Sequence, residues 1–396
     1  MYKRNFRSGP ARHRIGSTQG SGRGPRKQTS FRDISKFVNK AVITEQTEHF
    51  VPEHAFNDFP IDHRLKASIT ARKYTEPTPI QDRAIPHVLR GSDVVGIANT
   101  GTGKTAAFLI PLIDKVIKDK KAQILIMVPT RELAVQIEQE FKEFTHGSGI
   151  HSVCCVGGVG IGGQIASLRR FNSFVIGTPG RLKDLIERRV LSLHNFATVV
   201  LDEADRMLDM GFIKDMRLLI AQMPKERQTL FFSATLSSEI ERLIGEFTRE
   251  PVRISVKVSE TAKNVDQDVV HIKRGSNKID TLQELLAQPE FSKVLIFGRT
   301  KHGVEKLAEI LAKRGFKAES IHGNKNQSKR QKALSLFKDS RVQALVATDV
   351  AARGLDISDV SHVINFDLPA TYDDYVHRIG RTGRGNKKGK ALTFIE

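Results

Sequence analysis

A glycine-rich segment, ANTGTGKT at residues 98–105, has the composition of a loop that holds phosphate groups. It follows the apolar run DVVGI (93–97) and precedes an apolar helical stretch. Glycines let backbone N–H groups curl around phosphate oxygens, and the N-terminus of a helix adds partial positive charge. In such a loop Lys104 would reach the β- and γ-phosphates of a nucleotide, and Thr105 would offer its hydroxyl to Mg²⁺. The common pattern has Gly where this chain has Ala98, and a glycine-rich turn with a chance Lys-Thr pair is the plainer alternative.

Three carboxylates follow about 100 residues later, in VVLDEAD, directly after another apolar run. In open parallel sheets, ligands bind at the carboxyl ends of the strands. There Asp202 would hold Mg²⁺, usually through water, and Glu203 would orient and deprotonate an attacking water. Acidic residues after a strand can also be solvated turn residues. The phosphate loop in the same half of the chain favours the catalytic interpretation.

Apolar runs that alternate with amphipathic stretches would position these groups. Near-continuous apolar runs with helical stretches between them are typical of a parallel sheet covered on both faces. The predicted strands lie at 93–97, 123–128, 173–177, 198–201, 228–232, 293–297, 343–347 and 362–366, with a last one in GKALTFIE, and 131–144 is one of the predicted helices.

The two halves of the chain repeat one arrangement. ILIMVPTRELAVQIEQEF contains a predicted strand, then Thr130, then a helix, and KVLIFGRTKHGVEKLAEIL has the same order with Thr300. A repeat about 170 residues long favours a duplicated domain. We therefore expect an α/β protein with two tandem domains, at 43–250 and 269–396, joined by a polar linker at 251–268.

The charge of the chain is strongly positive and unevenly distributed. The 396 residues carry a formal charge of +19, which favours a polyanionic partner, with nucleic acid ahead of an anionic membrane. Residues 1–42 contain eleven Lys and Arg and one acidic residue, Asp33, in a Gly- and Ser-rich setting. We expect this segment to be a disordered arm that acts either as a phosphate clamp or as a solubilising tail.

Composition also argues against several classes of protein. No apolar run approaches the roughly 18–20 residues of a membrane span, and the N-terminus lacks the apolar core of a secretory signal. The two cysteines, Cys154 and Cys155, are adjacent and have no metal-ligand spacing around them. We expect a soluble cytoplasmic protein without membrane contacts.

With the phosphate loop and DEAD both in place, residues 56–396 closely resemble the DEAD-box RNA helicases of superfamily 2, of the bacterial type. The other motifs appear in family order: PTRELA (129–134), a Gly pair (157–158), TPGR (178–181), SAT (233–235), LIFGRTK (295–301), HGNKNQSKR (322–330), ATDVAARGLDI (347–357) and HRIGRTGR (377–384). The resemblance implies two RecA-like domains that close on ATP and single-stranded RNA, with Mg²⁺ as the metal.

The resemblance also implies the residues of the nucleotide site. Gln81 would hydrogen-bond the adenine edge, and Phe56, which suits a core position by residue type alone, would stack on the base. The residues implied to bind ATP are Phe56, Tyr74, Pro79, Gln81, Ala98, Asn99, Thr100, Gly101, Thr102, Gly103, Lys104, Thr105, Ala106 and Asp356. Thr105 and Asp202 are implied to hold the metal.

The implied catalytic residues come from both halves. They are Lys104, Glu203, His377, Arg381 and Arg384. Arg381 and Arg384 match the family's arginine fingers, which are worth about 10³–10⁵ in rate in related phosphoryl-transfer enzymes. Asp205, Ser233 and Thr235, with His377, would couple the nucleotide to RNA.

The implied RNA contacts suit recognition of the backbone, independent of base sequence, because Arg, small residues and backbone N–H groups hold phosphates and 2′-OH groups. They are Pro129, Thr130, Arg131, Gly158, Thr178, Arg181, Arg299, Gln327, Arg330 and Thr348. Three positions depart mildly from the family: Lys73 replaces Gly, Asn99 replaces Gln and Thr102 replaces Ser. The chain also ends after its last predicted strand, where the family has one more helix.

The implied activity is RNA-dependent ATP hydrolysis that locally unwinds short RNA duplexes or remodels ribonucleoprotein. The implied state is a monomer, with ribosomal or RNA-decay proteins as further partners. Two alternatives remain open: an RNA-clamping or annealing protein whose ATP turnover is incidental, and a DNA-directed ATPase.

Overall fold

The computed structural model describes residues 50–99, 101–256, 265–272, 275, 277–352, 357, 359–383 and 389–395. The predictions made for the basic arm at 1–42 and for Thr100, Asp356 and Arg384 lie outside these residues. The described residues belong to one compact unit, residues 37–396.

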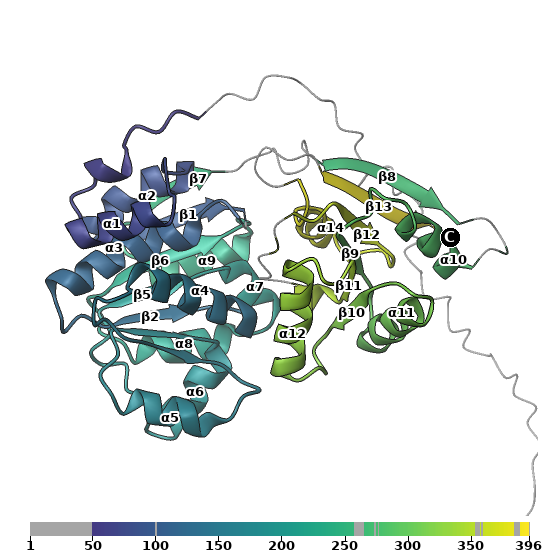
Figure 1. Cartoon of the computed structure of the whole chain (residues 1–396). Coiled ribbons are helices and arrows are strands. Elements are labelled where there is room, and N and C mark those ends of the chain that lie inside the picture. The colour runs from purple at the N-terminus through teal and green to yellow at the C-terminus, as the bar shows by residue number, and fades with distance from the viewer. Residues whose placement is uncertain are drawn as a thin grey trace, which may run out of the picture. The chain divides into compact units, whose positions relative to one another are not determined.

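Within the described residues, seven strands form a parallel sheet in the order β3-β4-β2-β5-β6-β1-β7 (Figure 1). They are β1 (Val94–Ala98), β2 (Ile124–Met127), β3 (Ser152–Cys155), β4 (Phe174–Gly177), β5 (Thr198–Leu201), β6 (Gln228–Ser233) and β7 (Val252–Val256). Successive side chains of β2 enter opposite apolar layers, since Ile124 and Ile126 pack on one face and Leu125 and Met127 on the other.

Helices cover both faces of this sheet, as predicted. One face packs against α1 (His63–Ala71), α2 (Pro79–Leu89), α3 (Lys104–Lys118), α4 (Arg131–Phe144) and the short 3₁₀ helix η2 (Phe56–Asp58). The other face packs against α5 (Ile161–Leu168), α6 (Pro179–Glu187), α7 (Ala204–Asp209), α8 (Ile213–Ala221) and α9 (Ser238–Phe247).

The second half of the chain forms a smaller sheet of the same kind. Six described strands, all parallel to their neighbours, lie in the order β10-β11-β9-β12-β13-β8. They are β8 (Val265–His271), β9 (Val294–Phe297), β10 (Ala318–Ile321), β11 (Ala344–Ala347), β12 (His362–Asn365) and β13 (Gly389–Ile395). One face packs against α12 (Gln327–Lys338), α13 (Asp349–Ala352) and α14 (Tyr372–Ile379), and the other against α10 (Lys278–Leu286) and α11 (Lys301–Lys313).

The stretch expected to be a linker, 251–268, contains strand at both of its ends. β7 pairs along β1, and β8 begins at Val265 and pairs along β13. Both are edge strands, and β7 alternates exposed and buried residues, so it lacks the continuous apolar run of a central strand. Of this stretch, residues 257–264 lie outside the described residues.

In each sheet, one of the covering helices begins with a threonine N-cap. The hydroxyl oxygen of Thr130 accepts a hydrogen bond from the N–H of Leu133 at the start of α4, and that of Thr300 accepts one from Gly303 at the start of α11. The cap satisfies a backbone donor that the first turn of a helix leaves free. The predicted repeat of strand, threonine and helix is therefore present. No helix among the described residues has the length and hydropathy needed to cross a bilayer.

Candidate nucleotide and RNA site

The loop between β1 and α3 has the backbone of a phosphate cradle. Gly101 and Gly103 have φ of 86° and 91°, in the left-handed region that glycine adopts without strain. A Cβ on Gly103 would also lie 2.4 Å from Nε2 of Gln81, so a side chain here would be strained and would displace the Gln81 amide. Lys104 begins α3, is buried, and donates from Nζ to the carbonyl of Ala98 at 2.9 Å. The loop thus holds its lysine beside the strand end.

Gln81 joins the predicted adenine-binding element to this loop. The N–H of Thr78 donates to Gln81 Oε1 at 2.9 Å, and Gln81 Nε2 donates to the carbonyl of Gly103 at 3.1 Å. Pro79 occupies the first turn of α2, which begins at this capping box. Lys73, the departure from the family's glycine, has φ of 59°, a conformation that costs free energy for a side chain with a Cβ.

Phe56 lies in the core, as its residue type alone suggested. Its ring is 5% exposed and makes edge contacts with Phe59 and Tyr74, at centroid distances of 6.1 and 5.9 Å. Its role in stacking on a base stays a prediction. The Tyr74 hydroxyl donates to Glu140 Oε1 at 3.2 Å.

The carboxylates lie where β5 ends, and both are buried. Burial raises the pKa of Asp202 to about 6, while the nearby charge of Lys104 acts in the opposite direction. Asp202 Oδ1 accepts the N–H of Glu203 at 2.9 Å. Glu203 itself has φ of 54°, an uncommon conformation for glutamate that is held by its place between β5 and α7.

A cavity of about 210 Å³ brings these groups together. It is lined by Tyr74, Gly101, Gly103, Lys104, Thr105, Leu133, Gln136, Glu140, Asp202 and Glu203. Thr105 and Asp202 offer oxygen atoms, which Mg²⁺ prefers, and a carboxylate that burial destabilises gains most from a nearby cation. The residues present therefore fit a magnesium ion. Beside the cavity, Thr102 Oγ1 donates to the carbonyl of Asn99 at 2.9 Å, and Ala106 is buried in α3.

Asp205 links the DEAD segment to the SAT segment at the end of β6. Its Oδ2 accepts hydrogen bonds from the N–H of Ala234 and from both the N–H and the hydroxyl of Thr235, at 3.0–3.1 Å. Ser233 Oγ donates to the carbonyl of Thr235 at 2.8 Å. The three residues predicted to couple nucleotide and RNA therefore form one hydrogen-bonded group.

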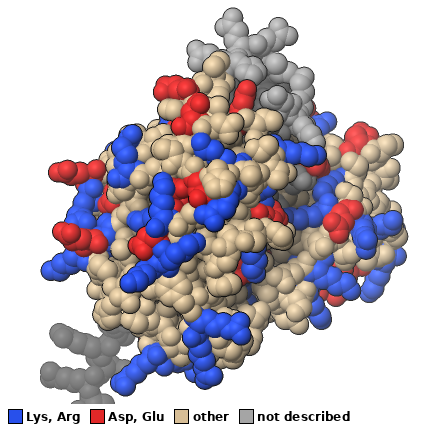
Figure 2. Space-filling view, turned by 60° about the vertical axis from the view of Figure 1, so that its left-hand side comes forward, with Lys and Arg blue, Asp and Glu red and all other residues tan. Residues whose placement is uncertain are grey.

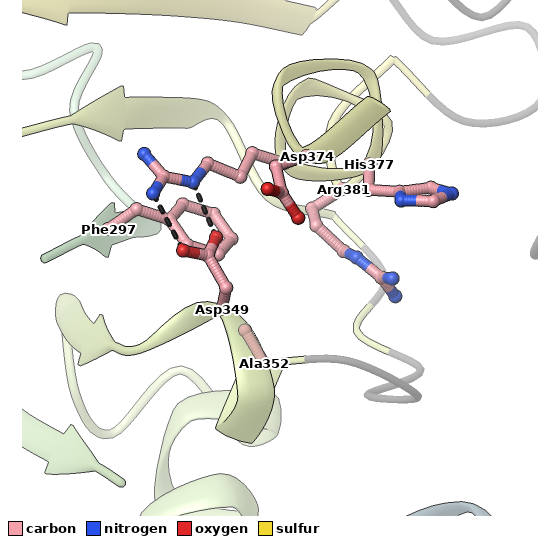
Figure 3. A pocket seen from close by; sticks show the side chains of 7 residues that line it. Phe297, Asp349, Ala352, Asp374, His377 and Arg381 are labelled. Carbon is pink, nitrogen blue, oxygen red and sulfur yellow. Dashed lines mark hydrogen bonds and ion pairs between the residues drawn. The ribbon is translucent and has the colours of Figure 1, made fainter. Parts of the chain in front are cut away.

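At the second sheet, the anchored arginine is Arg378, which the sequence analysis did not single out although it lies within HRIGRTGR. It is 2% exposed, and Nε and Nη2 donate to the two carboxylate oxygens of Asp349 at 2.6 and 2.8 Å, the pair of dashed lines in Figure 3. Nη1 donates to Asn365 Oδ1 and to the carbonyl of Asp367. Its guanidinium also lies 5.0 Å from the ring of Phe297. The sequence signal that could have indicated this pair was Asp349, an acidic residue that starts a helix directly after β11.

Of the predicted catalytic residues of this half, His377 lies on α14 and Arg381 just after it. His377 and Arg381 extend away from Asp349 in Figure 3, and Arg381 is buried. Burial, followed by the positive charge of Arg206, lowers the pKa of His377 to about 4. His377 is therefore neutral at pH 7.

The predicted RNA-binding residues of the first sheet gather at the carboxyl ends of its strands. The guanidinium of Arg131 lies over the Gly pair, so that a Cβ on Gly158 (φ 73°) would meet it at 1.7 Å. Thr178 is the N-cap residue of α6, and its N–H donates to the carbonyl oxygen of Cys155 at 3.1 Å. Pro129 and Thr130 are buried at the end of β2. Arg181 Nη2 donates to the carbonyl of Val159 at 3.5 Å.

The predicted RNA-binding residues of the second sheet follow β9, β10 and β11. Arg330 Nη2 lies 3.0 Å from Glu132 Oε2, a partner that the sequence analysis missed. Gln327 is 4% exposed, and within the described part of the chain neither atom of its side-chain amide has a hydrogen-bond partner. Arg299 is exposed, with its N–H on Asp367, and Thr348 is half-buried. Buried polar atoms without partners, here also Arg181 Nη1 and Arg330 Nε, are what a polar ligand would satisfy.

Two family models match the chain in the order of its sheets. The "DEAD/DEAH box helicase" model matches residues 78–243, and the "Helicase conserved C-terminal domain" model matches residues 277–386. The DEAD-box ATP-dependent RNA helicase CshA of Bacillus subtilis is 46% identical over 342 residues, which cover 86% of this chain and 69% of that protein. This chain belongs to the DEAD-box helicase family.

Another DEAD-box relative, the ATP-dependent RNA helicase CshA of Listeria monocytogenes, is 45% identical over 86% of this chain and 66% of its own length. The chain thus spans about two thirds of both proteins, and both are bacterial.

Solved DEAD-box structures confirm the predicted fold class. Saccharomyces cerevisiae Dbp5 bound to RNA and ADP BeF3 is 30% identical with a TM-score of 0.77, over 86% of this chain and 89% of that one. Mss116 bound to single-stranded RNA and UDP-BeF is 31% identical with a TM-score of 0.78, over 87% and 76%. The two sheets are tandem RecA-like domains.

Proposed function

We propose that this DEAD-box protein is an RNA-dependent ATPase that binds the backbone of single-stranded RNA and locally separates short RNA duplexes or remodels ribonucleoprotein. The observation that carries the proposal is the cavity where Lys104, Thr105, Asp202 and Glu203 meet at one sheet edge. A lysine, a hydroxyl and two carboxylates around a glycine-rich loop are the groups that phosphoryl transfer to water requires.

Each group has a separate task in hydrolysis. Lys104 leaves its bond to Ala98 and holds the terminal phosphate oxygens, over which the negative charge of the transferred group is spread. Glu203 orients a water molecule and accepts its proton. Thr105 and Asp202 would hold Mg²⁺, which would neutralise negative charge on the phosphates. The buried position of these groups strengthens their electrostatic effect because little water screens them.

Coupling between ATP and RNA follows from the path between the two sites. Asp205 lies two residues after Glu203 and holds Thr235 through its side chain. In this proposal, domain closure brings Arg381 and Arg384 to the γ-phosphate and bends the bound strand, with His377 between the nucleotide and SAT. ATP and RNA then favour each other's binding, by about 1–3 kcal/mol if the coupling is typical of linked sites.

The RNA residues would act through phosphates and 2′-OH groups. Arg131, Arg181 and Arg299 suit phosphates, and the unpartnered amide of Gln327 suits a 2′-OH group, which both donates and accepts. This division of roles predicts binding that depends on salt and hardly on base sequence.

The remaining assignments complete the proposal. We keep the division into an arm (1–42), two domains (43–250 and 269–396) and a connecting stretch (251–268) as part of the proposal, with β7 and the start of β8 assigned to the sheets. The arm adds phosphate contacts. The protein acts in the cytoplasm as a monomer and works with ribosomal or RNA-decay proteins.

ATP hydrolysis measured with and without single-stranded RNA tests the proposal, with Glu203→Gln as the variant because it keeps the shape of the side chain. We expect strong stimulation by RNA in the native chain, and loss of turnover with retained RNA binding in the variant. Equal stimulation by DNA would favour the DNA-directed alternative. RNA binding and annealing with flat ATP turnover would favour the clamping alternative, and both results contradict the proposal.

A further inference from the structure

A forty-residue stretch of the first domain, residues 144–183, contains no acidic residue. The whole chain has 44 Asp and Glu in 396 residues, or one in nine. The stretch carries Arg169, Arg170, Arg181, Lys183 and two histidines. It begins at the end of α4 and ends in α6, and α5 is its central helix. An RNA strand bound over residues 144–183 would meet no negatively charged side chain of this stretch.

Helix α5 leads from the carboxyl ends of the strands, where the predicted RNA-binding residues lie, to the other end of the sheet. Because β3 and β4 are parallel, α5 starts near the carboxyl ends of the strands, three residues after Gly158, and returns to their amino ends. Its eight residues span about 12 Å, the length of about three to four stacked nucleotides. Its outer side is small and open: Gly162, Gly163 and Ala166 are exposed, and a Cβ on either glycine would meet nothing within 4 Å.

At the far end of α5 lies a cavity of about 330 Å³, separate from the nucleotide cavity. It is lined by His151, Ser152, Ala166, Ser167, Arg170 and Asn172. The Oγ atom of Ser152 is buried, and no group among the described residues forms a hydrogen bond with it. Asn172 Nδ2 donates to the carbonyls of Ser167 and Arg170, which fixes the rim of the cavity. A cationic side chain and a free hydroxyl in an acid-free cavity suit a phosphate group.

An exposed aromatic residue adjoins this cavity in the sequence. Phe171 is 54% exposed and lies between two residues that line it, Arg170 and Asn172. Burial of a phenylalanine ring is normally favourable, so an exposed one beside arginine points to a ligand with a flat apolar face. Figure 2 shows Lys and Arg side chains without Asp or Glu beside them at the lower end of the view, the height at which Figure 1 has α5 and α6.

We propose that the single-stranded RNA flanking the motif groove leaves it at Gly158, follows the outer side of α5, and places a phosphate in the His151–Arg170 cavity with a base on Phe171. Arginine would neutralise the backbone and the ring would stack on the base, a combination that binds single strands of any sequence. The proposal rests on the RNA binding described under Proposed function. It extends the RNA footprint to a surface that the family motifs do not include.

The test is a series of RNA oligonucleotides, from about 4 to about 16 nucleotides, lengthened at the 5′ end in one set and at the 3′ end in another. We expect the native chain to bind the long RNA about tenfold or more tightly than the short one, for one direction of lengthening. Arg169→Ala with Arg170→Ala should bind the short RNA as the native chain does and lose most of the gain. Its salt slope on long RNA should fall by about 1.4, since each lost phosphate contact on a single strand contributes about 0.7.

Phe171→Ala separates the ring from the charges. We expect about tenfold weaker binding of long RNA with an unchanged salt slope, because stacking releases no counterions. Lys225→Ala with Arg242→Ala is the matched control: both residues are exposed in the same domain, and the pair removes the same charge away from α5. Because all these side chains lie at the surface, equal unfolding temperatures should confirm that the variants fold.

The outcomes separate this inference from the proposed function. If the native chain binds no short RNA, the proposed function fails. If it binds short RNA with RNA-stimulated ATPase activity, yet lengthening in either direction adds nothing, only the flanking subsite is overturned. An equal loss in the Lys225/Arg242 control overturns it as well, because the effect is then one of net charge.

Discussion

In each sheet, loops gather at the carboxyl ends of the strands, and we call these two places the first edge and the second edge. They have the same backbone arrangement, but their side chains carry opposite charge. In both, a strand ends, a threonine caps the next helix, and the loops gather above the sheet. Above the first sheet, buried carboxylates and one lysine line a cavity. Above the second, arginines dominate, and the most buried of them is held by Asp349.

The difference shows that the duplicated fold supplies positions and the loop residues supply charge. At the first edge, Lys104, Thr105, Asp202 and Glu203 line one cavity, which is the proposed site for the phosphates and Mg²⁺. The second edge holds one arginine in place through Asp349, Asn365 and Asp367, and this fixed arginine positions the helix that carries His377 and leads to Arg381. In the proposed mechanism, the arginines of the second edge add to the groups of the first.

A large effect should come from removing the cation of the first edge. Lys104→Ala should lower ATP turnover about 100- to 1000-fold, because the charge that develops on the phosphate loses its nearest protein donor. Steady-state ATPase assays with saturating RNA measure this. Lys120→Ala, an exposed lysine just after the same helix, is the control and should keep native turnover. A similar loss in both variants would contradict a special role for the first edge.

The buried ion pair of the second edge should matter for stability. Asp349→Ala leaves Arg378, 2% exposed, without its bidentate partner, and should lower the free energy of unfolding by about 3 kcal/mol. Chemical denaturation measures this. Asp280→Ala breaks the exposed pair with Arg314 in the same domain and should cost less than about 1 kcal/mol. Equal costs would show that Arg378 is not the anchor of this edge.

The neutral His377 predicts a dependence of stability on pH. Burial lowers its pKa from 6.5 to about 4, so the unfolded chain binds this proton more readily than the folded one. Its stabilising contribution is complete above pH 6.5 and is lost as the pH falls toward 4, at up to about 1.4 kcal/mol per pH unit. Denaturation of the native chain and of His377→Asn from pH 7 to pH 5 should show a shallower loss in the variant. Parallel curves would contradict the assignment.

The smallest effects should come from the two capping threonines. Thr130→Ala and Thr300→Ala each remove one cap and should each lower the free energy of unfolding by about 1 kcal/mol. Thr130 alone is also a proposed RNA contact, so only its variant should weaken RNA binding as well. Serine at either position keeps the hydroxyl and should restore the cap. Equal RNA affinities in the two alanine variants would remove Thr130 from the RNA site.

Sequence patterns predicted the interior of both sheets and missed their edges. The central strands are buried on both faces and therefore appear as continuous apolar runs, such as those in β2 and β9. The four strands without a prediction, β3, β7, β8 and β10, are the four edge strands. Edge strands have one neighbour and tolerate polar residues, so AESI and VRISV lack the signal.

The sequence likewise predicted some features of the candidate site and missed others. Motif spacing predicted a glycine-rich loop and carboxylates after strands, and these segments do follow β1 and β5, since their position depends on strand ends and local backbone. The partners of Arg378 and Arg330 are acids from distant segments, and no local pattern pairs Arg378 with Asp349 or Arg330 with Glu132. Phe56 shows a further limit: an aromatic residue suits both a core and a ligand, and here the core holds it.

The most direct test of the account is single-turnover ATP hydrolysis by Arg381→Ala with RNA and ATP both saturating. If the second edge completes the active site of the first, this variant should bind ATP and RNA normally while the rate of hydrolysis falls about 10³-fold or more. A native rate of hydrolysis would show that the first edge works alone, and would contradict the account.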